Sequence, residues 1–352
     1  MTLTFWPGFP LWRELYHPIE RRWWRCRPTA RGVDLGFRDD EETEWGSRVV
    51  HKSPPAPENW SSVMVREAAE AQAVGYARRL LDEQLADGFV EHSRAPGTQL
   101  WEQLPALWCA QSSAFDPEPL VRAQASCEAP ALSEVTTWLA LAGASNVPPE
   151  KQWWPPLIGE AEQAAARAEL LQHADRILPA LVLALRHDER NVTTAARDAL
   201  AAARASNEPW LFDGLVDRMV HQPVDRGELA LALAPVLARL CPITDERIAT
   251  LRALVLKSPA RGDTPSEYLA HRAGMELALA LAEWAADPRA AAALRSCLYD
   301  GTRTVTAWAV LKAAQVAPSA QWREPLLRAR PLFGKLGERY RDEVDAALAA
   351  CA

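Results

Sequence analysis

Six arginines near the start of the chain are the residues whose type and spacing best suit binding chemistry. Residues 1–38 hold seven arginines against three acidic residues, and two consecutive tryptophans lie among them. Guanidinium groups beside aromatic rings can bind nucleic acid or an acidic face of another protein. The alternative is that nearby carboxylates, including the acidic run 39–44, neutralise these charges within the fold. The candidate nucleic-acid contacts are Arg21, Arg22, Arg25, Arg27, Arg31 and Arg38.

A second basic set lies in the C-terminal half, on segments whose apolar spacing predicts the second helices of helical hairpins. These charges fall on faces that the apolar stripes leave free, so they form a candidate surface for an acidic protein or for phosphate groups. The alternative is that they are the solvated sides of amphipathic helices. The candidate partner-binding residues are Arg190, Arg197, Arg204, Arg303 and Lys312.

Motifs typical of catalysis or metal binding are missing from the sequence. None of the seven histidines lies in an HExxH motif, and the six cysteines include no CxxC pair, so we expect no metal site. There is no GxSxG elbow, no GxxxxGK[ST] loop and no dinucleotide fingerprint. We therefore expect no catalytic residue and no cofactor, and an enzyme of unrecognised type is the third of three functional alternatives.

The second basic set must be positioned by a repeated helical unit, because helices run almost continuously after Gly159. Two copies align without a gap: Leu181, Leu185, Val192 and Ala196 match Leu294, Leu298, Val305 and Ala309. One such hairpin cannot bury its own apolar face, so the pattern predicts an α-solenoid of stacked hairpins. They are expected at residues 177–204, 208–240, 244–286, 287–317 and 321–351, with 132–142 and 160–172 pairing to open the stack.

The first basic set belongs to a segment of different character. Residues 23–27, 32–38 and 48–52 alternate like strands, and residues 62–86 have the period of an amphipathic helix. Gly88 can adopt the left-handed conformation that ends such a helix, and residues 89–91 would form a closing strand. We therefore predict a small α+β domain at 1–95, a proline-rich acidic connector at 96–130 and the solenoid at 131–352, a mainly α protein.

The helical hairpins resemble HEAT repeats. The run LPALVLALRHDERNVTTAARDAL at 178–200 matches the pattern of that family, namely an apolar first helix, a turn containing Asp, and Val with small residues along the second helix. A second copy follows at 290–314, and the resemblance covers roughly residues 160–352. It implies a protein that binds a partner along a helical-repeat surface.

The N-terminal segment resembles a WGR domain, a small sheet-plus-helix module of poly(ADP-ribose) polymerases and bacterial regulators. The best match is ARRLLDEQLADGFVE at 77–91, which looks like the module's final helix, glycine stop and closing strand. The defining Trp-Gly-Arg appears here as Leu-Gly-Phe-Arg at 35–38. In the polymerases this module contacts DNA, so the resemblance implies a degenerate WGR-like domain with a nucleic-acid role as an alternative function.

Composition limits the functional classes further. The net charge of −7 and the pI of about 5.6 argue against a protein that coats nucleic acid. No apolar run reaches the roughly 18 residues of a membrane span, and the N-terminus lacks a signal-peptide pattern, so we expect a cytoplasmic protein. High Ala, Arg and Leu usage hints at a bacterial source. The sequence thus predicts a non-enzymatic adaptor or regulatory subunit whose partner is another protein, such as a toxin or an enzyme subunit; the alternative is a nucleic-acid-binding regulator.

Overall fold

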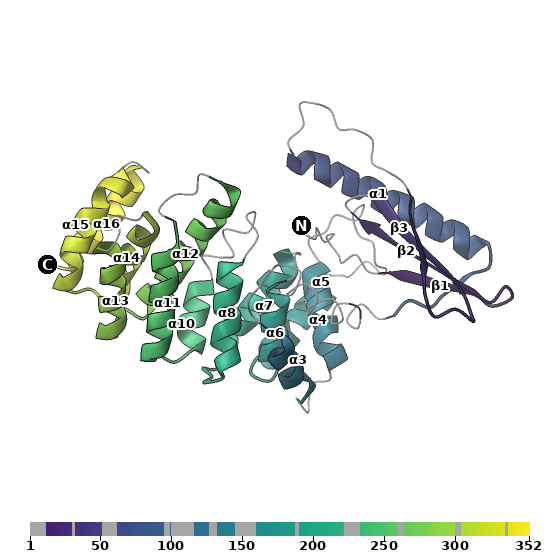
Figure 1. The fold of residues 1–352 in the computed structure, drawn as a ribbon, viewed down its shortest axis with the longest axis horizontal. Coiled ribbons are helices and arrows are strands. Elements are labelled where there is room, and N and C mark those ends of the chain that lie inside the picture. Colours follow the sequence, from purple (N-terminus) through teal and green to yellow (C-terminus); the bar gives the residue numbers. More distant parts are fainter. Residues whose placement is uncertain are drawn as a thin grey trace. The chain divides into compact units, whose positions relative to one another are not determined.

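The computed structural model describes most of the chain, which divides into two compact units. The described ranges are 12–29, 32–50, 62–94, 99, 116–126, 132–144, 160–186, 190–221, 233–259, 264–299, 304–334 and 337–352. The first unit is Met1–Ala110 with Leu120–Ala199, and the second is Gln111–Pro119 with Leu200–Ala352. The protein is mainly helical with a small antiparallel sheet near the N-terminus (Figure 1). In the described ranges, no helix is both long and apolar enough to cross a membrane.

A five-stranded antiparallel sheet forms the start of the first unit. Its strands are β1 (Arg13–His17), β2 (Arg22–Thr29), β3 (Gly32–Asp39), β4 (Gly46–Val50) and β5 (Val90–Glu91), in the order β4-β3-β2-β1-β5. The strands expected at 23–27 and 32–38 are confirmed within two residues at their ends. The third expected strand, 48–52, overlaps β4 at residues 48–50, and its last two residues lie outside the described residues. The acidic run links β3 to β4. Strand β1 was not predicted, because its sequence RELYH shows no alternation of apolar residues.

Helix α1 (Ser62–Ala86) packs on one face of this sheet, contacting β2 and β3. The helix has the bounds expected from the sequence, and Gly88 takes the predicted left-handed conformation, with φ +97°. Alternate strand residues point toward the helix, since successive side chains of a strand lie on opposite faces. The resulting core contains Leu15, Trp24, Cys26, Val33, Leu35, Ala73, Val74, Ala77, Leu81 and Phe89. The other face of the sheet therefore carries the odd-numbered residues of β2.

Short helices complete the first unit: α3 (Glu118–Ala125), α4 (Leu132–Ala144), α5 (Glu160–Gln172), α6 (Leu178–Ala184) and α7 (Arg190–Ala202). Helices α4 and α5 pair, as expected, and the side chain of Gln163 donates a 3.0 Å hydrogen bond to the carbonyl of Ala142. The boundaries between the two units fall inside α3, between Pro119 and Leu120, and inside α7, between Ala199 and Leu200, so the start of α3 belongs to the second unit. The division predicted at residues 95 and 130 stays a prediction.

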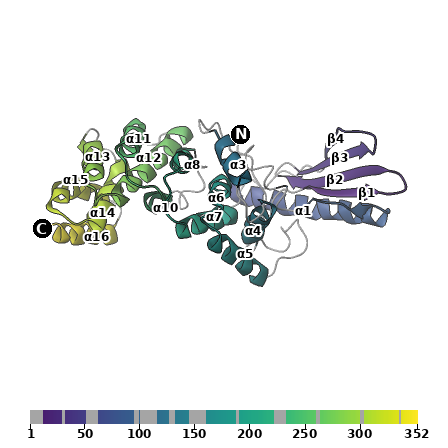
Figure 2. The ribbon, with the colours of Figure 1, turned by 90° about the horizontal axis from the view of Figure 1, so that it is seen from below.

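The second unit consists of paired helices (Figure 2). They are α8 (Pro209–Val220), α10 (Leu233–Leu240), α11 (Asp245–Lys257), α12 (Pro265–Glu283), α13 (Pro288–Tyr299), α14 (Thr304–Val316), α15 (Arg323–Gly334) and α16 (Glu338–Ala350). All lie within the hairpin ranges expected from the sequence. Threonine side chains cap two of them: Thr244 accepts from the amide of Arg247, and Thr264 forms a capping box with Glu267.

One pair of opposite charges is fully buried in the second unit. Arg218 of α8 and Glu276 of α12 both have no solvent-exposed surface, and α8 contacts α12. Burial raises the pKa of Glu276 well above its ordinary value, and the positive charge of Arg218 opposes that shift. Such a pair constrains how two helices can pack, because displacing either residue leaves the other charge in an apolar environment.

Candidate functional site

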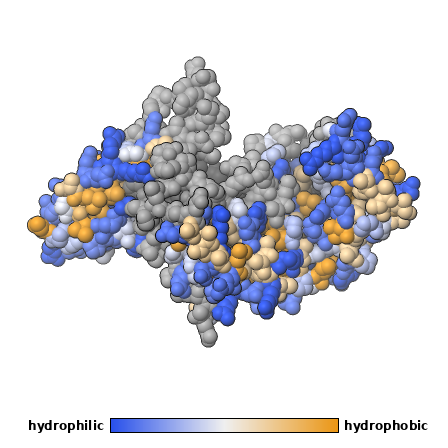
Figure 3. Space-filling model, turned by 180° about the vertical axis from the view of Figure 1, so that it is seen from behind, coloured by the Kyte–Doolittle hydropathy of each residue, from blue (hydrophilic) through white to orange (hydrophobic). Residues whose placement is uncertain are grey.

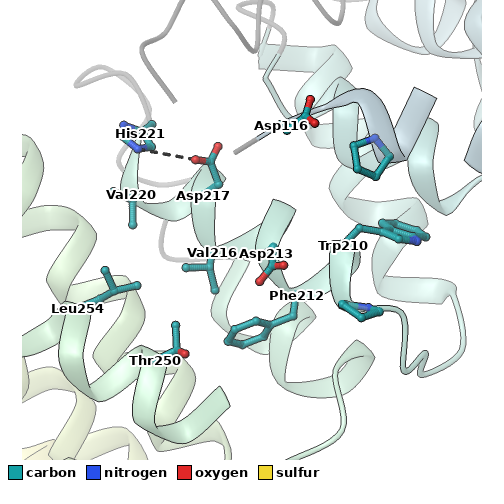
Figure 4. A pocket seen from close by; sticks show the side chains of 12 residues that line it. Asp116, Trp210, Phe212, Asp213, Val216, Asp217, Val220, His221, Thr250 and Leu254 are labelled. Atoms are coloured by element: carbon teal, nitrogen blue, oxygen red, sulfur yellow. Dashed lines mark ion pairs between the residues drawn. The ribbon is translucent and has the colours of Figure 1, made fainter. Parts of the chain in front are cut away.

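A groove of about 690 Å³ lies mainly between helices α8 and α11 of the second unit. Its walls are mostly apolar and aromatic, and they include buried Phe212 and Val216 with half-buried Trp210 and Leu254. Helical spacing determines which side chains line the groove, because residues four apart lie on the same face of a helix. On α8 this spacing places residues 212, 216 and 220 together, and on α11 it places 250 and 254 together (Figure 4).

Three carboxylates also line this groove: Asp116, Asp213 and Asp217. Asp217 is 8% exposed, and its Oδ1 lies 3.7 Å from Nε2 of His221, one turn further along the chain (Figure 4). Burial raises the pKa of Asp213, although the nearby guanidinium of Arg247 opposes this change. No lysine or arginine is among the residues that line the groove within the described part of the chain. The groove therefore combines an apolar floor with an excess of negative charge.

Helix starts and one aromatic contact fix the geometry of the groove. Asp116 precedes α3 and accepts a 3.0 Å hydrogen bond from the amide of Glu118, so its position is tied to that helix start. Arg247 of α11 lies over the ring of Phe212 of α8, with its Cζ 5.3 Å from the ring centroid, and donates to the carbonyl of Pro242 at 2.8 Å. Of these contacts, the one between Arg247 and Phe212 links α8 to α11 beside the groove.

A second candidate surface is the face of the sheet that α1 does not cover, here named the Arg–Trp face. It consists of Trp12, Trp23, Arg25, Arg27, Arg38 and Trp45. The guanidinium of Arg25 lies 4.2 Å from the ring of Trp12 and 4.0 Å from that of Trp45. Arg38 similarly lies 4.9 Å from the ring of Trp23 and 4.8 Å from that of Trp45. These are cation–π distances.

A glycine makes this stacking feasible. Gly36 of β3 lies opposite Arg25 of β2, and a Cβ atom there would come within 2.7 Å of Nε of Arg25 and 3.0 Å of Cε3 of Trp45. Glu14 lies 3.7 Å from Arg25, and Asp34 accepts from Arg27 at 3.1 Å. Burial lowers the pKa of Arg25; Glu14 counteracts this, whereas the neighbouring arginines lower it further. Part of the positive charge of this face is thus neutralised within the fold.

The structure brings together three of the six arginines expected to contact nucleic acid: Arg25, Arg27 and Arg38 share the Arg–Trp face. Arg21 and Arg22 lie at the turn from β1 to β2 and form ion pairs with Asp40 and Glu20. Arg31 lies outside the described residues.

The predicted partner-binding residues are paired with acidic neighbours where the structure describes their contacts. Arg197 of α7 forms a 2.6 Å ion pair with Asp198, and Lys312 of α14 forms a 3.2 Å ion pair with Glu283. Arg204 follows the end of α7 and is exposed. Arg303 and the side chain of Arg190 lie outside the described residues, although the backbone of Arg190 begins α7.

The sequence analysis missed the groove between α8 and α11. A signal for it was present in PWLFDGLVDRMV, where two aspartates four residues apart share a helix face with apolar residues. The contributions of Asp116 and of α11 come from distant segments, so sequence spacing could not reveal them. Among described residues, no group of three or more histidines, cysteines and acidic residues could hold a metal ion. Comparison with known proteins found no matching family model, curated protein or solved structure.

Proposed function

We propose that this chain is a non-enzymatic adaptor or regulatory subunit that binds another protein along a HEAT-like helical array. The groove between α8 and α11 carries this proposal. It is open, mainly apolar and rimmed by carboxylates, a combination typical of sites that receive a side chain or short segment of a partner.

The order of helix contacts in the second unit supports a stacked array. Within hairpins, α11 packs on α12, α13 on α14, and α15 on α16. Between hairpins, α10 packs on α12 and α12 on α14, while α11 packs on α13. Second helices thus contact the second helices of the neighbouring hairpins, and the first helices α11 and α13 contact each other, whereas α8 packs on α10 and α12. Contacts between the second helices of successive hairpins are expected of a solenoid.

The surface of the described helices offers few rival sites of apolar character. Figure 3 shows hydrophilic and hydrophobic residues interspersed on one face, rather than gathered into a single patch. The exposed large hydrophobic residues of the second unit, Tyr268, Val316 and Leu327, come from separate helices. Single exposed apolar residues are ordinary on protein surfaces, so the groove remains the better candidate.

A groove-filling variant tests the proposal. Thr250 is exposed on the α11 side of the groove, and Thr250→Trp places an indole in the cavity. The tagged protein, purified from its native cells, should retain one dominant protein partner, and Thr250→Trp should lose it. Ala249→Trp is the matched control, because Ala249 is exposed on the same helix but does not line the groove. Equal partner retention by both variants, at equal melting temperatures, would contradict the proposal.

The Arg–Trp face supports a second candidate function, binding of nucleic acid. Arg38 has no ion pair with any described residue, and its guanidinium lies between two indoles on which bases could stack. Titration of a fluorescent single-stranded oligonucleotide at two salt concentrations tests this function. Arg38→Gln should weaken binding, whereas Arg339→Gln, on exposed α16, should not. Equal affinity of the two variants would exclude the Arg–Trp face as the binding site.

A further inference from the structure

We propose that the groove between α8 and α11 selects a basic segment of the partner protein, in which an arginine or lysine is flanked by apolar residues. This inference rests on the proposed function, because it names the chemistry of the segment that the adaptor binds. The ligand is inferred to be a protein segment, because the apolar floor of the groove needs apolar side chains to cover it.

Charge complementarity is the first argument. Asp213 and Asp217 lie one turn apart on α8, and Asp116 lies at the start of α3, all lining one cavity. Within the described residues, the lining offers no cationic side chain except His221, which is already 3.7 Å from Asp217. An acidic segment would meet like charges in a partly desolvated groove, whereas a basic segment meets complementary ones.

The fold already contains an intramolecular example of the proposed contact. Arg247 lies over the ring of Phe212, 5.3 Å from its centroid, and its charge acts on Asp213. A guanidinium is therefore accommodated beside this aromatic ring and this carboxylate. Asp213 remains exposed on the groove side, where a second cation can reach it. Trp210, half-buried in the same wall, adds another ring suited to a cation or to the methylene stem of an arginine.

The cavity continues in a direction that favours apolar residues next to the basic one. A second cavity of about 440 Å³ shares Val220, His221 and Leu254 with the groove. Its further lining comes largely from the apolar side chains of α12, including Leu269 and Leu277, and it contains Lys257 but no carboxylate among described residues. A bound segment would therefore place its cation at the aspartates and its apolar residues toward α12.

The test compares two synthetic peptides by fluorescence anisotropy with the full-length protein. Both are fluorescein-labelled twelve-residue peptides of Leu, Ala and one charged residue type, which is Arg in one and Glu in the other. The Arg peptide should bind and the Glu peptide should not. Asp116→Asn/Asp213→Asn removes two carboxylate charges and keeps the hydrogen bond at the start of α3, because Asn caps helices as Asp does. It should weaken binding of the Arg peptide about tenfold.

Asp342→Asn/Glu338→Gln is the control, since it removes two exposed charges from α16, which does not line the groove. It should leave the affinity unchanged. Equal binding of the two peptides, or equal weakening by the two double variants, would overturn the basic specificity. If the Arg peptide fails to bind while Thr250→Trp still releases the native partner, the basic specificity is wrong and the docking function stands. If Thr250→Trp retains the partner, the docking function itself is wrong.

Discussion

Replacing Gly36 with alanine should destabilise the N-terminal sheet, whereas the same change at Gly75 should stabilise the protein slightly. At Gly36 the new methyl group would lie 2.7 Å from Nε and 2.9 Å from Cγ of Arg25, well inside normal contact. Arg25 has little freedom to move, because the rings of Trp12 and Trp45 lie 4.2 and 4.0 Å from its guanidinium. Overpacking of this kind costs about 1–3 kcal/mol, and loss of one stacking contact adds roughly 0.5–2 kcal/mol.

Gly75 provides the matched control. It lies on the exposed side of α1, and an added Cβ would meet no atom within 4 Å. Because glycine costs about 0.5–1 kcal/mol relative to alanine within a helix, Gly75→Ala should stabilise the fold by that amount.

Hydrogen–deuterium exchange of peptides from β2 and β3 gives the local readout, and urea unfolding followed by circular dichroism gives the global one. Gly36→Ala should speed exchange in both strands and lower the urea midpoint. Unchanged exchange in β2 after Gly36→Ala would refute the stacked geometry of the Arg–Trp face.

Three further predictions concern the second unit. Thr264→Ala removes the capping box of α12 and should lower the free energy of unfolding in urea by about 1 kcal/mol. Thr264→Ser should lower it less, because serine keeps the accepting oxygen. Equal losses in the two variants would contradict this prediction. Arg218→Met should destabilise the protein because it removes the positive charge that opposes the raised pKa of buried Glu276, and adding Glu276→Leu should recover most of the loss. Strictly additive losses would show that the two residues are not coupled. Asp287 has a pKa of about 2, lowered chiefly by its hydrogen bond with Arg289, so its stabilising contribution is present above the ordinary carboxyl pKa and is lost as the pH falls through about 2. NMR titration should show the pKa of Asp287 rising in Arg289→Gln, and an unchanged value would refute the assignment.

The helices of this protein were predictable because their signals are local. Apolar residues at helical spacing predicted α1 and the described helices of the five hairpin ranges.

Strand β1 and the groove were not predictable, since both depend on residues distant in the sequence. Arg13 is buried in β1 because Glu91 of β5 accepts from its Nε at 2.8 Å, a contact across 78 positions. A polar strand of this kind has no apolar pattern to detect. The groove likewise requires α8, α11 and the segment before α3 to meet. Local periodicity predicted α8 and α11, but not α3, which lies in the range 96–130 expected to be a proline-rich connector. It carried no information on which polar residues would share a cavity.

Charge counting on the two candidate surfaces favours a protein ligand over nucleic acid. The Arg–Trp face has three arginines, and two of them lie beside the carboxylates of Glu14 and Asp34, which leaves a net charge of about +1. Arg94 acts on Arg25 as a like charge and raises this to about +2. A plot of the logarithm of nucleic-acid affinity against the logarithm of salt concentration has a slope of roughly −0.7 to −0.9 for each neutralised phosphate. A net charge of about +2 on this face therefore predicts a slope near −2, which is typical of weak binding. The groove is lined by three carboxylates and one histidine, and the charge of Arg247 acts on Asp213, which leaves a net charge of about −2. This charge and the apolar walls of the groove act together on one ligand. A measured salt slope steeper than about −5 would reverse this preference, because it would require more phosphate contacts than the described arginines of the Arg–Trp face can make.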